Sequence, residues 1–233
     1  TEKLASRVKK VIAVELDDKL IKILQDRLKK QGIRNVEVIN GDILKISNFK
    51  FQISNQIPNP KFKYRTFGNK YKIVANLPYN ITSIFLRKFL GENEAKPELM
   101  VLMLQKEVAQ RIVAKDGKMS ILAVSVQFYA KPEIIDYVSK ENFWPEPEVD
   151  SAIVRLNVGA IHELPVQREK EFFQLVRIGF SSKRKMLKNN LAAGYQILPV
   201  EAEKKLIKAG FNTNIRAQEL SVESWLRLLT YFK

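Results

Sequence analysis

Short, largely apolar runs that alternate with helical patterns constrain the fold of this chain more than any other feature. Runs of this kind are typical of buried strands in parallel sheets. They occupy Val11–Val14, Val36–Ile39, Ile73–Ala75 and Met100–Leu104. Strands separated by helices predict an α/β fold with a doubly wound parallel sheet. Periodicity does not decide whether Ser120–Tyr129 is a helix or a strand.

Polar side chains follow three of these strands closely. Glu15 ends the first strand, Asp42 follows the second, and Asn76 ends the third. Ligands of doubly wound sheets lie beyond the carboxyl ends of the strands. A carboxylate at Glu15 suits the two hydroxyls of a ribose, and one at Asp42 suits an adenine amine. Each residue alone is also explained as a helix cap, but the series favours a nucleoside-shaped site.

The turn Asn76-Leu77-Pro78-Tyr79-Asn80 has the chemistry needed to hold a flat ring that bears an amine. The Asn76 amide oxygen and a backbone carbonyl can accept the two amine hydrogens, while the Tyr79 ring covers the ring face. Pro78 fixes its own φ and favours an extended Leu77, so the carbonyls are set in advance. An ordinary strand-to-helix turn is the alternative interpretation of this segment.

A dinucleotide dehydrogenase would need a Gly-rich loop between its first strand and first helix. The sequence contains no such loop, and residues from Thr1 have the pattern of a helix already under way. We therefore expect the first strand and the Gly-rich loop to be absent from this chain.

The chain contains no cysteine and a single histidine, His162. This composition excludes disulfides, thiol catalysis, and metal sites built from thiolates or several histidines. No apolar run approaches the roughly 18 residues that cross a bilayer. We expect chemistry without a metal, in the cytoplasm, with His162 on the surface.

Basic residues outnumber acidic ones by 40 to 25, for a formal net charge of +15. Such an excess favours a polyanionic partner, although it is also compatible with general solubility. Two stretches without acidic residues concentrate the charge. Lys45–Lys72 interleaves basic and aromatic residues, and Phe172–Val200 contains Arg177, Lys183, Arg184, Lys185 and Lys188. Basic side chains beside aromatic rings favour RNA or single-stranded nucleic acid over a membrane surface.

The pattern changes after Leu156. Residues 158–166 contain Gly159 and Pro165 and are typical of a linker. Helical patterns follow at Arg168–Phe180, Lys183–Ala193, Val200–Ala209 and Ser221–Tyr231. We therefore expect an α/β domain of residues 1–157 and a small basic helical domain of residues 158–233.

The proline-containing segment Asn142–Ser151 predicts a stiff loop. With Phe143 near its tip, this loop would supply a second aromatic face opposite Tyr79. The alternative is a rigid connection into the next strand, with Phe143 and Trp144 packed in the core. We expect Trp144 and Trp225 to pack rather than to stack on a ligand.

Several motifs, in order over nearly the whole chain, resemble the S-adenosylmethionine-dependent rRNA adenine N6,N6-dimethyltransferases. They are Ala13-Val14-Glu15-Leu16-Asp17, Gly41-Asp42, Asn76-Leu77-Pro78-Tyr79-Asn80, Met103–Ala109, Phe143–Ser151, Lys183-Arg184-Lys185 with Asn189-Asn190-Leu191, and Arg216–Ser221. The helical tail is similar to the branch that dimethylates two adjacent adenines near the 3′ end of small-subunit rRNA.

The resemblance implies a Rossmann-like catalytic domain that lacks its first strand, followed by an RNA-binding helical domain. Donor-binding roles would fall to Glu15, Leu16, Asp42, Ile43 and Asn76. The target adenine, flipped out of its stack, would meet Asn76, Leu77, Pro78, Tyr79 and Phe143. RNA-binding roles would fall to Lys183, Arg184, Lys185, Lys188 and Asn189. The implied cofactor is S-adenosylmethionine, and no metal is expected. The implied partner is small-subunit rRNA in the immature small ribosomal subunit. We expect the protein to act as a monomer.

The chain departs from the family in two places. Without the Gly-rich loop, which would cradle the methionine part of the donor, we expect weak donor binding. The Lys45–Lys72 segment is longer than the family's usual connection, and we expect it to add an RNA contact. Three alternatives stay open: an inactive ribosome-assembly factor, a large-subunit enzyme of the macrolide-resistance type, and a methyltransferase for DNA or protein amines.

Overall fold

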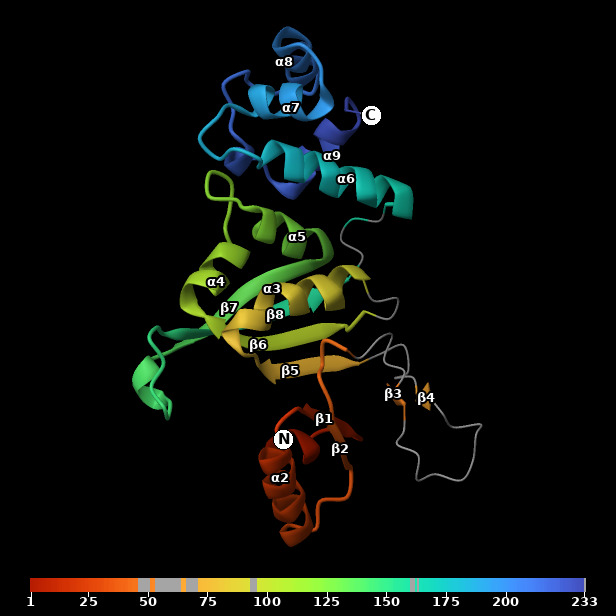
Figure 1. Ribbon diagram of the computed structural model, residues 1–233, viewed down its shortest axis with the longest axis vertical. Coiled ribbons are helices and arrows are strands. Elements are labelled where there is room, and N and C mark those ends of the chain that lie inside the picture. The colour runs from red at the N-terminus through yellow and green to blue at the C-terminus, as the bar shows by residue number, and fades with distance from the viewer. Residues whose placement is uncertain are drawn as a thin grey trace. The chain divides into compact units, whose positions relative to one another are not determined.

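The computed structural model describes residues 1–45, 51–52, 64–65, 71–92, 96–159, 162 and 164–232. The chain forms two compact units, Thr1–Gly68 and Asn69–Lys233 (Figure 1). Most of the Lys45–Lys72 segment lies outside the described residues, so its contact with RNA stays a prediction. No helix in the described part of the chain is long and apolar enough to cross a membrane.

The first unit is built on two parallel strands joined by a helix. Strand β1 (Val11–Glu15) pairs with β2 (Val36–Asn40), so that Glu15 lies opposite Asn40. Helix α2 (Asp18–Lys30) begins after Asp17, whose Oδ1 accepts the backbone N–H of Lys19 at 2.7 Å. The unit also contains α1 (Glu2–Ala5), β3 (Phe51–Gln52) and β4 (Tyr64–Arg65), the last two antiparallel. The first two predicted strands are therefore confirmed.

The second unit contains a mixed sheet in the order β5-β6-β8-β7. The strands are β5 (Lys72–Asn76), β6 (Leu99–Gln105), β7 (Ala130–Val138) and β8 (Ser151–Val158). Strands β5 and β6 are parallel, but β8 is antiparallel to both of its neighbours. The prediction of a purely parallel sheet is wrong here. Strand β7 passes to β8 through a loop without a crossover helix, which permits only antiparallel pairing of neighbours.

Helices of the second unit follow β5 and β6 and form the core with the sheet. They are η2 (Tyr79–Ile81), α3 (Thr82–Arg87) continued by a π turn (Lys88–Glu92), α4 (Lys106–Ile112) and α5 (Ile121–Tyr129). Alternate residues of β6 are fully buried, namely Met100, Leu102 and Leu104. Phe85 and Phe89 stack with ring centroids 4.4 Å apart. This buried layer fixes the position of β6, with which β5 pairs.

The four predicted C-terminal helices are confirmed as α6 (Val166–Gly179), α7 (Leu187–Tyr195), α8 (Pro199–Lys208) and α9 (Val222–Leu229). Helices α6 and α9 pack on α5 (Figure 1). The predicted start of the second helix at Lys183 is wrong, because Lys183–Met186 form a turn before α7. A short turn, η5 (Ala217–Glu219), precedes α9. The structure places these helices in one compact unit with the sheet. The boundary near residue 157 between a catalytic and an RNA-binding domain therefore stays a prediction.

Three aromatic residues test the expected burial. Trp225 is fully buried against Phe180, as predicted. Trp144 is 98% exposed, so its predicted packing is wrong. His162 is also misplaced by the prediction: its side chain is only 14% exposed, and Nε2 lies 3.7 Å from Oε1 of Glu223. Both errors concern residues in irregular segments, where no periodicity indicates which side chains are buried.

Candidate active site

The turn after β5 has the backbone geometry that its proline predicts. Pro78 has φ −55° and ψ 132°, and it precedes the 3-10 turn that begins at Tyr79. Leu77 is buried, and its N–H donates to the carbonyl oxygen of Met103 at 3.4 Å. The turn is therefore anchored to β6 on one side and to a helix on the other.

Two hydrogen-bond acceptors of this turn are free within the described residues. The carbonyl oxygen of Pro78 accepts the N–H of Ile81, and that of Tyr79 accepts the N–H of Thr82. In the described part of the chain, by contrast, no hydrogen bond uses the exposed Asn76 side chain or the Leu77 carbonyl oxygen. Two adjacent acceptors at the carboxyl end of β5, a strand whose residues are half-buried or exposed, can take both hydrogens of one amine.

The Tyr79 ring is held from a distant part of the chain. Its hydroxyl lies 2.9 Å from Oγ of Ser151, within hydrogen-bonding distance. Ser151 is fully buried at the start of β8, at the edge of the sheet where β5 and β6 end. The antiparallel direction of β8 thus brings Ser151 to the turn.

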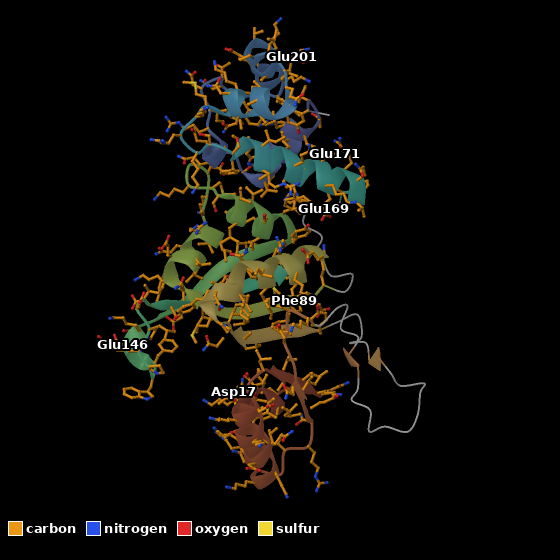
Figure 2. All side chains as sticks on the ribbon, viewed as in Figure 1. Asp17, Phe89, Glu146, Glu169, Glu171 and Glu201 are labelled. Carbon is orange, nitrogen blue, oxygen red and sulfur yellow. The ribbon has the colours of Figure 1, made fainter. Side chains whose placement is uncertain are left out.

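The loop that carries Phe143 is anchored at its base. Asp150 accepts hydrogen bonds from Lys106 Nζ, at 3.0 Å, and from the backbone N–H of Lys140, at 3.3 Å. These two hydrogen bonds lower the pKa of the Asp150 carboxyl group, and the bond from Lys106 has the larger effect. Lys140 also pairs with Glu146 at 2.8 Å, and Glu146 lies on the part of the loop that projects from the sheet (Figure 2). Among the described residues Phe143 and Tyr79 make no ring contact, so the two-sided aromatic clamp stays a prediction.

In the first unit, the predicted donor-binding residues lie at the carboxyl ends of β1 and β2. The N–H of Gly41 donates to the carbonyl oxygen of Glu15 at 2.9 Å, which brings the segment before Asp42 next to Glu15. Glu15 Oε1 accepts the N–H of Leu16 at 2.7 Å and that of Asp17 at 3.0 Å. Asp42 Oδ1 accepts the N–H of Leu44 at 2.9 Å.

This pattern fits a ligand with ribose hydroxyls and an exocyclic amine. One oxygen of each carboxylate is held by backbone amides, and the second oxygen of each has no partner within the described residues. Leu16 is exposed, and Ile43 is half-buried directly after Asp42. Oriented carboxylates beside apolar side chains are suited to a nucleoside.

The predicted RNA-binding residues gather around the turn before α7. Lys183, Arg184 and Lys185 are exposed, and none of them forms an ion pair with another described residue. Lys188 instead pairs with Glu203 of α8 at 3.2 Å. Asn189 is exposed in the first turn of α7. The turn therefore presents three free positive charges, whereas Lys188 joins α7 to α8.

Sequence reasoning missed two residues that hold these segments. Ser151 contacts Tyr79, and the buried Asn190 donates to the carbonyl oxygens of Gly179 and Ser182, both in the segment that leads into the basic turn. Both belong to motifs that the sequence analysis noted without assigning them a role. A small polar residue within an apolar segment was the available signal, since buried polar side chains require partners.

One cavity of the second unit is not lined by any predicted site residue. It measures about 710 Å³ and is lined in part by Lys96, Phe128, Tyr129, His162 and Glu169. Lys96 already lies over the Tyr129 ring, 4.2 Å from its centroid, and Tyr129 is bonded to Glu169. Lys96, Tyr129 and Glu169 thus already interact with one another, and the residues predicted for the methyl-transfer site lie at the strand ends instead.

Solved structures define the class of protein to which this fold belongs. The 23S rRNA methyltransferase ErmE superposes with a TM-score of 0.72 at 27% identity, covering 99% of this chain and 85% of that chain. A dimethyladenosine transferase from Plasmodium falciparum gives a TM-score of 0.74 at 27% identity, covering 99% and 84%. The fold is that of the Rossmann-like methyltransferases.

Sequence comparison narrows the class. The model of the family described as ribosomal RNA adenine dimethylase matches residues 1–233. A protein of Dehalococcoides mccartyi named ribosomal RNA small subunit methyltransferase A is 44% identical over 98% of this chain and 73% of its own length. A protein of the same name from Enterococcus faecalis is 37% identical over 98% and 75%. The chain belongs to the ribosomal RNA adenine dimethylase family, which confirms the enzyme class predicted from the sequence.

Proposed function

We propose that this chain transfers methyl groups from S-adenosylmethionine to N6 of two adjacent adenines near the 3′ end of small-subunit rRNA. The pair of free acceptors, the Asn76 side chain and the Leu77 carbonyl, carries the proposal. The names of the relatives support the choice of the small subunit.

The acceptor side of the reaction follows from the chemistry of the turn. When the Asn76 amide oxygen and the Leu77 carbonyl oxygen accept the two N6 hydrogens, the nitrogen lone pair is no longer drawn fully into the ring. Tyr79 stacks on the adenine and fixes its plane. The reaction needs no covalent enzyme intermediate. The rate acceleration would therefore come from the alignment of N6 with the methyl group and from the placement of the hydrogen-bond acceptors.

The donor side would be held by the first unit. When bound, S-adenosylmethionine would supply a methyl group on a sulfonium: the S–CH3 bond would break as the N6–CH3 bond forms, a neutral thioether would leave, and one N6 proton would pass to solvent. The free oxygen of Glu15 would accept the ribose hydroxyls, and that of Asp42 the adenine amine of the donor. Leu16 and Ile43 would contact its apolar faces, and Asn76 would lie between the donor and the target.

The RNA is held chiefly by charge. Lys183, Arg184 and Lys185 would contact phosphates, and Asn189 would add a polar contact in the adjacent turn of helix. The target adenine would leave its stack to reach Asn76, at low cost in an unpaired loop. In this proposal the protein acts as a monomer, its substrate is the immature small ribosomal subunit, and the reaction takes place in the cytoplasm.

Replacing Asn76 by Ala tests the proposal, with Asn80→Ala as the matched control. Asn80 is an exposed residue of the same type in the same turn. Tritium transfer from labelled S-adenosylmethionine to unmodified small ribosomal subunits is measured together with subunit binding. We expect Asn76→Ala to lower transfer at least about 100-fold, the typical effect of losing one such group. Binding should stay within twofold, and Asn80→Ala should retain transfer. Undiminished turnover by Asn76→Ala would overturn the proposal.

The similarity to the 23S rRNA methyltransferase ErmE supports a second candidate, a large-subunit enzyme. The same assay separates the two when small-subunit and large-subunit rRNA are offered together. Label confined to the large-subunit rRNA supports the second candidate. Binding to the small subunit without any incorporation supports an inactive assembly factor.

A further inference from the structure

We infer that Ser151 is a positioning residue that sets the plane of the Tyr79 ring, and thereby the plane of the target adenine. The inference rests on the proposed function, because it assigns a role within the adenine site. Ser151 itself does not touch the adenine; it acts through the hydroxyl of Tyr79.

The Ser151 hydroxyl is held in a fixed position by the surrounding backbone. The residue is fully buried and pairs with Gln105 of β6 on one side and with Val138 of β7 on the other. The preceding carbonyl oxygen, of Asp150, accepts the N–H of Lys106 at 3.0 Å. Two neighbouring strands and the start of α4 therefore fix the position of Oγ.

The orientation of the Tyr79 ring is not fixed by its own backbone segment alone. Tyr79 begins a three-residue 3-10 turn, an element with poorer hydrogen-bond geometry than a long helix or a sheet. The residue is half-buried, so one part of its surface is open for a stacked base. A bond of 2.9 Å at the far end of the ring removes rotation that its two side-chain torsions would otherwise allow.

No other side-chain hydrogen bond of Ser151 occurs within the described residues. A fully buried hydroxyl without a partner would destabilise the fold. The Tyr79 hydroxyl is thus the group that satisfies Ser151, and Ser151 in turn orients Tyr79. Stacking itself does not require the hydroxyl, because a phenyl ring has the same face.

This division of roles predicts which kinetic constant changes. RNA affinity comes mainly from phosphate contacts, which the proposed function assigns to the basic turn and not to Ser151 or Tyr79. Methyl transfer depends on the alignment of N6, and small misplacements of a reacting group lower the rate strongly. Loss of the Ser151–Tyr79 bond should therefore lower kcat and leave KM for the ribosomal substrate nearly unchanged.

The experiment compares Ser151→Ala, Tyr79→Phe and the double variant in the methyl-transfer assay. Both single variants remove the same hydrogen bond, and Tyr79→Phe keeps the stacking ring. We expect each to lower kcat about tenfold, as for the loss of one hydrogen bond of about 1.4 kcal/mol. The double variant should be no slower than the slower single variant.

Additive losses in the double variant, or a change in KM alone, would overturn the inference. Thermal unfolding of each variant shows whether Ser151→Ala is folded; if it is not, the expected tenfold loss of kcat in the folded Tyr79→Phe decides. Asn76→Ala, assayed in parallel, separates this inference from the proposed function. If Asn76→Ala is inactive while Ser151→Ala and Tyr79→Phe are unaffected, only the role of Ser151 is lost. An active Asn76→Ala overturns the adenine site itself.

Discussion

The side-chain amide of Asn190, in α7, donates a hydrogen bond of 2.6 Å to the carbonyl oxygen of Gly179, the last residue of α6. The same nitrogen donates to the carbonyl oxygen of Ser182 at 3.0 Å. Asn190 is buried, so these bonds hold both sides of the segment that leads into Lys183–Lys185. The exposed basic turn is therefore shaped from inside the helical core.

Replacing Asn190 by Ala should lower the free energy of unfolding by about 1–3 kcal/mol, because two carbonyl oxygens lose their shared donor. RNA affinity should fall as well, since the basic turn is no longer held in one shape. The control is Asn214→Ala, which removes an exposed side chain of the same type outside the predicted RNA-binding residues. Chemical denaturation and RNA titration measure the two effects. Equal stability of both variants would contradict the role of Asn190.

Replacing Gly179 by Ala should destabilise the protein through a steric conflict. A Cβ at this position would lie 2.2 Å from Cη2 of Trp225, which is fully buried and cannot move aside freely. We expect a net loss of about 1–2 kcal/mol, because overpacking outweighs the roughly 1 kcal/mol that alanine adds in helix propensity. Gly159→Ala, where a Cβ would meet nothing within 4 Å, is the control and should leave the melting temperature nearly unchanged.

Neutralising the basic turn should weaken RNA binding in a salt-dependent way. If Lys183, Arg184 and Lys185 each contact a phosphate, changing all three to Gln lowers the slope of log K against log salt by about 2, at about 0.7 per contact on a single strand. The variant Lys22→Gln, Lys29→Gln, Lys30→Gln loses the same net charge from exposed positions of α2. An equal slope change in this control would mean that net charge, not the turn, attracts the RNA.

The stability of the protein should fall as the pH rises above about 10, the ordinary pKa of tyrosine. Burial, assisted by a hydrogen bond to Glu169, raises the pKa of Tyr129. Glu169 lies in the first turn of α6, on the side that faces α5 (Figure 2). The folded state keeps the phenol proton where the unfolded state loses it, so the unfolded state is favoured as the pH rises.

Tyr129→Phe checks this alkaline transition. At neutral pH the free energy of unfolding of the variant should be lower by about 1–2 kcal/mol, because the hydrogen bond to Glu169 is removed. Between pH 9 and about 11, however, its stability should decline less than that of the unchanged protein. Burial also raises the pKa of Tyr71 and Tyr195, so part of the decline should remain. Tyr137→Phe, at a half-exposed position, is the control. Denaturation curves at several pH values measure both variants, and parallel declines would rule out Tyr129 as a source.

The strand-end residues could be predicted because each lies next to its own strand in the sequence. Glu15 and Asn76 end apolar runs, and the direction of those runs was confirmed by the parallel pairing of β1 with β2 and of β5 with β6. The proline of the turn likewise sets local backbone angles without help from distant residues. Roles in donor and RNA binding stay predictions, because they require a ligand that no local pattern contains.

By itself, the sequence determined the alternation of helices and strands, the helical tail, the polar strand ends and the family. These properties depend on residue spacing, which is a local quantity. Only the tertiary structure decided that β8 runs antiparallel, that Trp144 is exposed and His162 mostly covered, and that Ser151 meets Tyr79. The last two residues are 72 positions apart. Their contact exists because chain reversal through the 139–150 loop returns β8 to the edge where β5 ends, and no periodicity encodes which buried hydroxyl finds which partner.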